Sequence, residues 1–366
     1  MNRPTLDEMQ LGPLIIRADA GPEIGSGHVM RCLGLAEAWR NANGRVVFAL
    51  ARGATELDNR LRSACSEIVS ISAEPGSADD AIQTRELCRS WGASWLVVDG
   101  FRFSSGYCVD ARTGVSRLLL VDDHGERPSY QCDIVVNLNP QAADRMYTRR
   151  DAGTRLLLGP HYALVRREFL SCEHKSCNVS ERARQILITF GGADPHNVTL
   201  RAFQALQRIH DLPLDITVIV GASNPHGASL KTAISCSRHA ARLLVSVDNM
   251  AEVMTQSDLA VTAGGGTCYE LAYMKVPMFL ITMAKNHERT IEAYREARAA
   301  VAGGWFDALT EQTLADLLRS VIGDQQLRQK LLENAGRMVD GRGAERVVET
   351  MRAISQNEAH GQWLDT

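Results

Sequence analysis

The stretch ADAGPEIGSGHVMRCLGLAEAW, at positions 18–39, combines residue types that could do chemistry, because a glycine-rich turn leads into a helical pattern. Glycines such as Gly25 and Gly27 let the backbone turn sharply and approach a ligand closely. A helix that begins near His28 offers unpaired N–H groups and a partial positive charge, which suit an anion such as phosphate. An imidazole at that place can act as a general acid or base, or donate to a phosphate oxygen. We therefore predict a functional His28, the alternative being a histidine that only caps the loop.

Two charged residues flank this turn. Arg31 follows His28 by three positions and is expected on the same face of the helix. It could pair with a bound anion or with Asp19. The turn lacks the third glycine, near Met30, that a dinucleotide-binding fingerprint needs. A phosphate site of another kind is therefore expected.

A second glycine cluster lies in SDLAVTAGGGTCYELAYMKVPMFLI, at positions 257–281. A predicted strand runs into three consecutive glycines, 264–266, and then into a helix, which predicts another group of N–H donors for a diphosphate. Thr267 can add a hydroxyl. Glu270 lies one turn further on, where its carboxylate could accept hydrogen bonds from ribose hydroxyls. Alternatively, Glu270 is a first-turn residue favoured by the helix dipole.

The segment ITFGGADPHN, at positions 188–197, repeats the order of strand, glycine turn and helix start, with the helix expected to begin at Asp194-Pro195. Gly191 and Gly192 would let a ligand approach in the crevice beyond the carboxyl end of the strand. An ordinary tight turn explains the same residues equally well.

Further polar residues follow other predicted strands. Asn286 and His287 are expected at the carboxyl end of a strand, where such folds place ligand-binding groups. A polar loop without a function would have a similar sequence. The triplet 122–124, Asp-Asp-His, could hold a metal or supply a base, and a capping role is at least as plausible.

A metal site is not predicted. Cys172 and Cys177, with His174 between them, fit no standard zinc spacing, and a solvated linker is the preferred interpretation. The remaining cysteines of the nine in the chain are scattered, as expected for free thiols in a reducing cytosol.

Composition narrows the classes of function. The 366 residues carry a formal net charge of −3, which predicts neither a nucleic-acid surface nor a polybasic membrane patch. The N-terminal residues lack a secretory pattern and no apolar run is long enough to span a membrane, so a cytoplasmic protein is expected. The sequence contains neither the G-x-S-x-G elbow of serine hydrolases nor the P-loop pattern of ATPases.

Short apolar runs alternate with helical patterns, which predicts an α/β protein with parallel sheets covered on both faces. The expected strands are 14–18, 46–50, 68–71, 95–99, 118–122, 134–138, 186–190, 216–220, 243–245, 259–261 and 278–281. In the first half, helices are expected at 29–41, 55–65 and 78–91, and the segment 310–354 reads as helical. The last twelve residues look frayed.

The polar stretch SCEHKSCNVSERAR, at positions 171–184, interrupts this alternation and is interpreted as an interdomain linker. The predicted domains are residues 1–170 with the histidine loop, residues 171–340 with the nucleotide site, and residues 341–366 as a C-terminal helix and tail.

Taken together, the motifs resemble one family of nucleotide-sugar hydrolases, those acting on UDP-2,4-diacetamido-2,4,6-trideoxy-β-L-altropyranose in pseudaminic acid biosynthesis, with their spore-coat polysaccharide relatives. The resemblance covers about residues 14–300. Six blocks agree in order: RADAGPEIGSGHVMRCLGLAEAW, VVDGF, VDDHGERPSYQCDIVVNLN, LLGPHYALVRREF, FGGADPHNVT and TAGGGTCYELAYMKVPMFLI. The family is similar to MurG-type glycosyltransferases, which implies a GT-B-like fold with two Rossmann-like domains facing across a cleft.

The resemblance also implies an activity. Water would displace UDP at the anomeric carbon, with C–O cleavage and inversion, and the family's essential histidine falls on His28. Its diphosphate loop falls on residues 264–267, its ribose-binding glutamate on Glu270 and its sugar-contacting asparagine on Asn286. Residues 247–250 fall where backbone groups read the uracil.

Two positions depart from the family pattern. Phe101 replaces the usual tyrosine after the VVD strand, and His287 replaces a glutamine. The loss of the phenol hydroxyl removes a hydrogen-bond donor near the sugar.

These inferences define the predicted site. The predicted catalytic residues are His28 and Asp19. The predicted substrate-binding residues are Gly25, Ser26, Gly27, Arg17, Arg31, Phe101, Gly191, Gly192, Asn249, Met250, Gly264, Gly265, Gly266, Thr267, Glu270, Asn286 and His287. No cofactor is expected, the partner is a UDP-sugar, and the chain is expected to be a monomer or weak homodimer. An inverting glycosyltransferase and a non-catalytic nucleotide-sugar-binding protein are the alternative functions.

Overall fold

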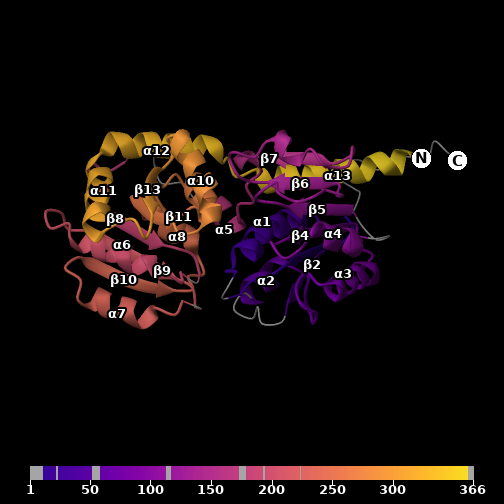
Figure 1. The fold of residues 1–366 in the computed structure, drawn as a ribbon, viewed down its shortest axis with the longest axis horizontal. Coiled ribbons are helices and arrows are strands. Elements are labelled where there is room, and N and C mark those ends of the chain that lie inside the picture. Colours follow the sequence, from indigo (N-terminus) through magenta and orange to yellow (C-terminus); the bar gives the residue numbers. More distant parts are fainter. Residues whose placement is uncertain are drawn as a thin grey trace. The chain divides into compact units, whose positions relative to one another are not determined.

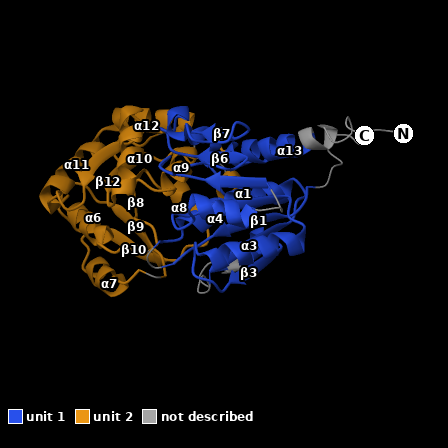
Figure 2. Cartoon of the chain, turned by 45° about the vertical axis from the view of Figure 1, so that its right-hand side comes forward, with its two compact units in different colours: residues 1–166, 342–366 blue, residues 167–341 orange. Residues whose placement is uncertain are grey.

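The structure is a computed structural model that describes residues 11–21, 24–51, 58–112, 117–172, 179–192, 194–222 and 224–361. The chain forms two compact units, one of residues 1–166 and 342–366, the other of residues 167–341 (Figure 2). The sequence predicts divisions after 170 and 340 and sets the last segment apart. The structure instead joins that segment to unit 1.

Unit 1 is built on a seven-stranded sheet in which all neighbouring strands are parallel (Figure 1). The spatial order is β3-β2-β1-β4-β5-β6-β7. The strands are β1 (Leu14–Ala18), β2 (Val46–Ala51), β3 (Glu67–Ile71), β4 (Trp95–Asp99), β5 (Arg117–Val121), β6 (Ile134–Asn137) and β7 (Arg155–Leu158). The central strands β1 and β4 are buried along their whole length, as continuous apolar runs predict.

Helices cover both faces of this sheet. They are α1 (Gly27–Asn41), α2 (Asp58–Ala64), α3 (Ala78–Trp91), α4 (Ser105–Arg112) and α13 (Gly343–Gly361), with 3-10 turns η2 (Asp144–Tyr147) and η3 (Pro160–Tyr162). Helix α3 begins where the Ser77 side chain accepts from the Asp80 N–H and ends at Gly92 in the left-handed conformation. Ile15 and Leu96 pack with α3 and α4 on one face, whereas on the other face Trp95 Nε1 donates to Ser355 Oγ of α13.

Unit 2 is built on a six-stranded parallel sheet in the order β10-β9-β8-β11-β12-β13. The strands are β8 (Gln185–Thr189), β9 (Asp215–Val220), β10 (Ala240–Val245), β11 (Leu259–Ala263), β12 (Met278–Thr282) and β13 (Val301–Trp305). The helices are α5 (Arg167–Leu170), α6 (Val198–Gln207), α7 (Gly227–Ser235), α8 (Met250–Thr255), α9 (Thr267–Tyr273), α10 (Lys285–Glu296), α11 (Glu311–Gly323) and α12 (Gln325–Met338). Ile186 and Ile188 of the central strand β8 join Val198 and Leu318, from α6 and α11, in one buried cluster.

The α/β class with two parallel sheets is confirmed, and each expected strand overlaps an observed one. Strands β7 and β13 were not predicted from the sequence. The expected helix 55–65 is α2, and its predicted first residues lie outside the described part of the chain. Within the predicted linker, residues 179–184 form neither helix nor strand, whereas 173–178 lie outside the described residues.

The C-terminal part is more regular than the sequence indicates. The helical segment 310–354 is three helices, α11, α12 and α13, and α13 continues to Gly361 instead of fraying at 355. Across the described residues, we find no helix that is both long and apolar enough to cross a membrane.

The strand order determines where a site can form. In each sheet the order reverses beside the first strand of the unit, between β1 and β4 in unit 1 and between β8 and β11 in unit 2. In open parallel sheets, ligands bind beyond the carboxyl ends of the strands at such a reversal. The loops that follow these four strands, together with the first turns of α1 and α9, hold most of the predicted site residues.

Candidate active site

His28 forms a pair with a buried aspartate that sequence reasoning missed. Its Nδ1 lies 2.7 Å from Oδ1 of Asp99, the last residue of β4, and the aspartate is completely buried. His28 comes from the first turn of α1, after β1, and β1 pairs with β4. The sheet therefore brings together two residues that are 71 positions apart. When Nδ1–H donates to the carboxylate, Nε2 carries the lone pair and can accept a proton.

Arg31 holds the Asp99 carboxylate in its ionised form. Its Nε and Nη2 donate to the two oxygens of Asp99, both at 2.6 Å, and its Nη1 donates to Asp123 at 2.7 Å. Burial alone would raise the pKa of the Asp99 carboxyl, but the charge and hydrogen bonds of Arg31, with those of His28, outweigh it and hold that pKa well below its usual range. The arginine and the two carboxylates together carry one net negative charge beside the imidazole.

These contacts correct the predicted role of Arg31. It pairs with Asp99 and Asp123 and not with Asp19. Its guanidinium is committed to two carboxylates, so these contacts give no support to the prediction that it binds a substrate anion.

The structure also separates Asp19 and Arg17 from the histidine. Asp19 accepts from Arg17 Nη1 at 2.6 Å and from the Ala51 N–H at 2.7 Å. Arg17 has no exposed surface and also donates to both oxygens of Asp80, in α3. Both predictions therefore need correction, because the carboxylate bonded to His28 is Asp99 and Arg17 cross-links β1 to α3. Asp19 Oδ2 is buried without a hydrogen-bond partner.

Two aromatic rings lie beside the imidazole. Phe101, just after β4, has its ring centroid 4.7 Å from that of His28 at an interplanar angle of 80°. His124, in the loop after β5, stacks on Phe101 with centroids 5.5 Å apart and an angle of 28°. Phe101 is 57% exposed. Phe101, a predicted substrate-binding residue, thus lies beside His28, and the exposed surface of its ring is apolar.

The loop before α1 leaves the start of the helix open. Gly21 and Gly25 exchange two backbone hydrogen bonds, at 3.1 and 2.7 Å, and Gly25 has a φ of 70°, which favours glycine. Ser26 is the N-cap residue, but its side chain makes no capping hydrogen bond. A side chain at Gly27 would meet no atom within 4 Å. Anion binding by Gly25, Ser26 and Gly27 at this helix start stays a prediction.

The start of α6, in contrast, is already occupied by a carboxylate. The two oxygens of Asp194 accept from the N–H groups of Val198 and Thr199, each at 2.9 Å. The helix begins at Val198, three residues beyond Pro195, which corrects the predicted start. An anion would meet the negative charge of Asp194 here, so this helix start is a poor phosphate site.

The backbone conformation and the close packing of the loop before α6 explain why positions 191 and 192 are glycines. Gly191 has a φ of 81°, in the left-handed region. A Cβ on Gly221, in the loop after β9, would lie 2.7 Å from the Cα of Gly192. The two loops therefore pack backbone against backbone, and the alternative of a tight turn explains Gly191 and Gly192 without a ligand.

The triple-glycine loop lies between the starts of two helices. A Cβ on Gly264 would lie 2.6 Å from Ile291 Cγ1 and 3.0 Å from the carbonyl oxygen of His287, so this glycine lets α10 approach the loop that leads into α9. Side chains at Gly265 and Gly266 would meet no atom within 4 Å. Neither α9 nor α10 has a side-chain hydrogen bond at its N-cap. Two uncapped helix starts meet at this loop, which suits a diphosphate better than either would alone.

The remaining predicted residues of unit 2 border the same sheet edge. Thr267 and Glu270 lie in the first turn of α9, and Asn286 and His287 in the first turn of α10. His287 Nδ1 is buried without a hydrogen-bond partner, and burial lowers the pKa of this imidazole. The Asn249 side chain caps α8 by accepting from the Glu252 N–H at 3.2 Å. Recognition of the uracil by the backbone of residues 247–250 stays a prediction.

Of the other candidates, Asp122 has a structural role. It accepts from the N–H of Gly125 at 2.6 Å and from the hydroxyl of Tyr147 at 3.1 Å, which fixes the loop after β5. Among the described residues, no group of three histidines, cysteines, aspartates or glutamates could hold a metal ion. Cys177 and His174 lie outside those residues.

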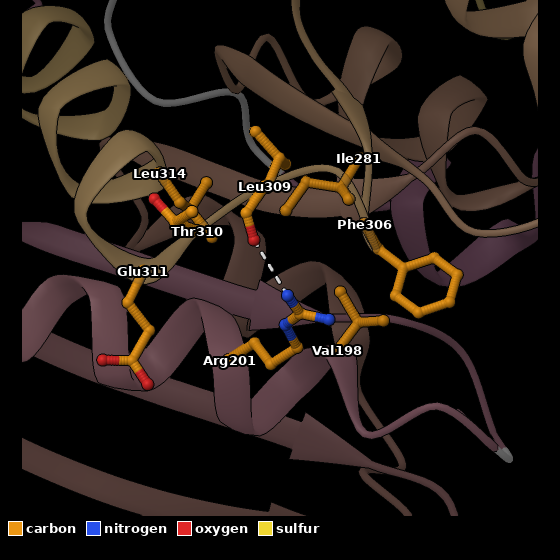
Figure 3. Close-up of a pocket in the computed structure, with 8 residues that line it drawn as sticks. All are labelled: Val198, Arg201, Ile281, Phe306, Leu309, Thr310, Glu311 and Leu314. Atoms are coloured by element: carbon orange, nitrogen blue, oxygen red, sulfur yellow. Dashed lines mark hydrogen bonds between the residues drawn. The ribbon is translucent and has the colours of Figure 1, made fainter.

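A pocket in unit 2 lies apart from all the predicted site residues (Figure 3). It lies between α6 and the segment that leads into α11, where Arg201 donates to the carbonyl oxygen of Leu309 at 2.8 Å. Its lining residues are Val198, Arg201, Ile281, Phe306, Leu309, Thr310, Glu311 and Leu314. Several of them belong to the buried cluster between the sheet and its helices, so we interpret this pocket as a packing gap and not as the active site.

Comparison with known proteins agrees with this architecture. Residues 185–350 match the family model described as the Glycosyltransferase family 28 C-terminal domain. The crystal structure of Acinetobacter baumannii MurG is similar with a TM-score of 0.67 at 14% sequence identity, and the match covers 93% of this chain and 99% of that one. The fold is therefore that of GT-B glycosyltransferases.

Two curated proteins are similar in sequence. The chain is 22% identical over 251 residues to the spore coat polysaccharide biosynthesis protein SpsG of Bacillus subtilis, covering 68% of this chain and 73% of that protein. It is 24% identical over 280 residues to the UDP-2,4-diacetamido-2,4,6-trideoxy-β-L-altropyranose hydrolase of Campylobacter jejuni, covering 76% of this chain and 94% of that protein. The resemblance drawn from the six sequence blocks is confirmed.

Proposed function

We propose that this protein hydrolyses a UDP-activated diacetamido-trideoxy sugar and releases UDP, with C–O cleavage and inversion at the anomeric carbon, in nonulosonic acid biosynthesis of the pseudaminic type. The observation that carries the proposal is the 2.7 Å contact between His28 Nδ1 and the buried Asp99. This contact leaves Nε2 without a protein partner among the described residues, at an uncapped helix start. The similarity to the Campylobacter jejuni hydrolase supports the choice of substrate.

In the proposed reaction, Nε2 of His28 accepts a proton from a water molecule. The water oxygen bonds to the anomeric carbon as the bond from that carbon to the β-phosphate oxygen of UDP breaks, and the bonding electrons leave with UDP. The imidazolium that forms is stabilised by Asp99, which Arg31 keeps ionised. Attack from the side opposite the leaving group inverts the anomeric configuration.

Unit 2 supplies the proposed nucleotide site. The uncapped starts of α9 and α10 would bind the diphosphate, with Gly265 and Gly266 leaving room for it. The Thr267 hydroxyl and the Glu270 carboxylate would bind a phosphate oxygen and the ribose. The UDP leaving group is already anionic, so it needs no protonation by an acid of the protein.

An inverting glycosyltransferase for a surface polysaccharide or glycolipid is the second candidate. The match of residues 185–350 to the family 28 glycosyltransferase domain favours it. The same histidine would then deprotonate an acceptor hydroxyl in place of water.

The test is to incubate the purified protein with UDP-2,4-diacetamido-2,4,6-trideoxy-β-L-altropyranose and to measure UDP release with and without saccharide acceptors. Release without an acceptor supports hydrolysis, whereas release only with an acceptor supports transfer. Tight binding without turnover would indicate a non-catalytic binding protein.

The variant His28→Ala should lower kcat by about 10²–10⁴-fold, the usual contribution of a general base. Its UDP affinity should stay within about twofold, because the proposed nucleotide site lies in unit 2. His161→Ala is the matched control, since His161 is an exposed histidine of unit 1 in η3. A His28→Ala protein with most of its activity would refute the catalytic assignment.

A further inference from the structure

A buried thiol lies beside the proposed catalytic pair, and no step of the proposed reaction uses it. Cys32 lies in α1, four residues after His28 and one after Arg31, and it is completely buried. Its Sγ lies 3.3 Å from Oδ2 of Asp99, to which the thiol donates. Residues three and four positions apart share one face of a helix, so these three residues of α1 direct their side chains to the same carboxylate.

The two oxygens of Asp99 divide these donors between them. Oδ1 accepts from Nδ1 of His28 at 2.7 Å and from Nη2 of Arg31 at 2.6 Å. Oδ2 accepts from Nε of Arg31 at 2.6 Å and from the thiol of Cys32. A carboxylate offers about four lone-pair sites. Arg31 takes two of them, His28 takes one on Oδ1, and Cys32 therefore takes the one that is left on Oδ2.

The thiol of Cys32 is a donor and not a nucleophile. Burial and the charge of Asp99 raise the pKa of this thiol well above its usual range, so the sulfur keeps its proton. Nucleophilic attack would need the thiolate, and Cys32 has no exposed surface through which a substrate could reach it. The S–H group is therefore available to the carboxylate at every pH at which the protein would act.

We infer that Cys32 is a positioning residue for the proposed base: its thiol completes the set of donors on Asp99 and thereby holds Oδ1 toward His28. This inference rests on the proposed function, because it needs His28 to accept a proton. Without the thiol, Oδ2 would be a buried acceptor that lacks one donor, which is costly. The carboxylate would then turn or take up a water molecule, and its contact with the imidazole would loosen. A buried network is rigid only when each of its members is satisfied.

Packing is the alternative explanation, because free cysteine is among the residue types most often buried. Two substitutions separate the donor from the volume. Cys32→Ala removes the donor and should lower kcat about fivefold to tenfold, the effect of one lost hydrogen bond, while KM stays within about twofold. Cys32→Ser keeps a donor in a side chain of similar shape and should restore kcat to within about twofold of the parent protein.

The assay is UDP release from UDP-2,4-diacetamido-2,4,6-trideoxy-β-L-altropyranose at saturating and limiting concentrations. Cys88→Ala is the matched control, because Cys88 is another completely buried cysteine of unit 1, in α3. It makes the same truncation in the core and should leave kcat unchanged. Urea melts of the three variants should show that each is folded under the assay conditions.

The hydrogen bond is tested without any substrate, by infrared spectroscopy of the S–H stretching band. Subtraction of the Cys32→Ala spectrum from that of the parent protein isolates the band of Cys32 from those of the other cysteines. A hydrogen bond to an ionised acceptor is stronger than one to a neutral group. We therefore expect this band at a lower frequency than the bands of the other thiols, and at a higher frequency in Asp99→Asn than in the parent.

Three results would overturn the inference. They are a Cys32→Ala protein with the parent kcat, a Cys32→Ser protein as slow as Cys32→Ala, and an S–H band of Cys32 at the frequency of the other thiols. Failure of the proposed function looks different, because the parent protein itself would then release no UDP. The position of the S–H band would still decide whether Cys32 holds Asp99.

Discussion

The pairing of His28 with Asp99 gives the sharpest prediction, which uses the substitution Asp99→Asn. Asparagine keeps the shape of the side chain but removes the negative charge that faces the imidazole. Two unit charges about 4 Å apart interact by about 4 kcal/mol at an effective dielectric constant near 20, which equals about 10³ in rate if the imidazolium forms fully in the transition state. Because only part of that charge develops there, we expect kcat to fall by about 10²–10³-fold.

The assay is UDP release under saturating sugar nucleotide, combined with UDP affinity by calorimetry. The affinity should remain within about twofold, since unit 2 carries the proposed nucleotide site. Asp133→Asn is the matched control: Asp133 is a partly buried carboxylate of unit 1 that pairs with Arg112 at 2.9 Å and does not contact His28. If Asp99→Asn kept more than about a third of the parent kcat, the pair would not be the catalytic unit.

The same substitution should also affect stability. Breaking a buried ion pair costs about 3–5 kcal/mol of unfolding free energy, and we expect the lower value because Arg31 retains Asp123. The folded-state pKa of Asp99 lies below its unfolded value, so its stabilisation is present above about pH 4 and is lost as the pH falls below that value. Urea melts at pH 7 should separate the two proteins more than melts at pH 3, and an equal separation would contradict this reasoning.

Four further substitutions test the helix starts and the ribose site. Asp194→Ala should destabilise unit 2 by about 1–2 kcal/mol, seen in urea melts, and leave UDP affinity unchanged, because it removes only the cap of α6. Gly264→Val should cost about 1–3 kcal/mol through overlap with Ile291, whereas Gly266→Ala, with no atom near its Cβ, should fold normally. Glu270→Ala should weaken UDP binding about tenfold in calorimetry, as expected for a lost charged hydrogen bond, and an unchanged dissociation constant would refute its ribose role.

The elements that the sequence predicts well are those with continuous apolar runs. The expected strands 14–18 and 95–99 and the helix 78–91 have the observed bounds, because β1 and β4 are buried on both faces and α3 has a serine cap and a terminal glycine. Strand β7 was missed because it is a four-residue edge strand with an exposed arginine. Strand β13 was missed because its sequence, VAGGW, contains two glycines and is largely unburied.

From the residues of the candidate site, the sequence indicates His28 but not the carboxylate that His28 contacts. His28 stands out through its glycine-rich turn, and Asp19 was predicted with it as a catalytic residue. Asp99 is 71 positions away and becomes its neighbour only through the pairing of β1 with β4. One sequence signal could have identified Asp99. It is an aspartate at the carboxyl end of one of the two strands between which the strand order reverses. The Asp194 carboxylate that caps α6 was likewise missed, because the sequence does not show which helix starts already bind a carboxylate of the protein.

The division of the chain has a consequence for biosynthesis. Unit 2 is one continuous segment, whereas unit 1 needs residues 342–366 as well as 1–166. A Cβ on Gly343 would come closer than 3.0 Å to the backbone of Tyr162 and Ala163, so α13 must dock tightly where unit 1 breaks off. Because this helix leaves the ribosome after unit 2, unit 2 can fold during translation before α13 covers one face of the first sheet. Nascent chains that stall before residue 342 should therefore be prone to aggregate through unit 1, while the segment between its two parts is already folded.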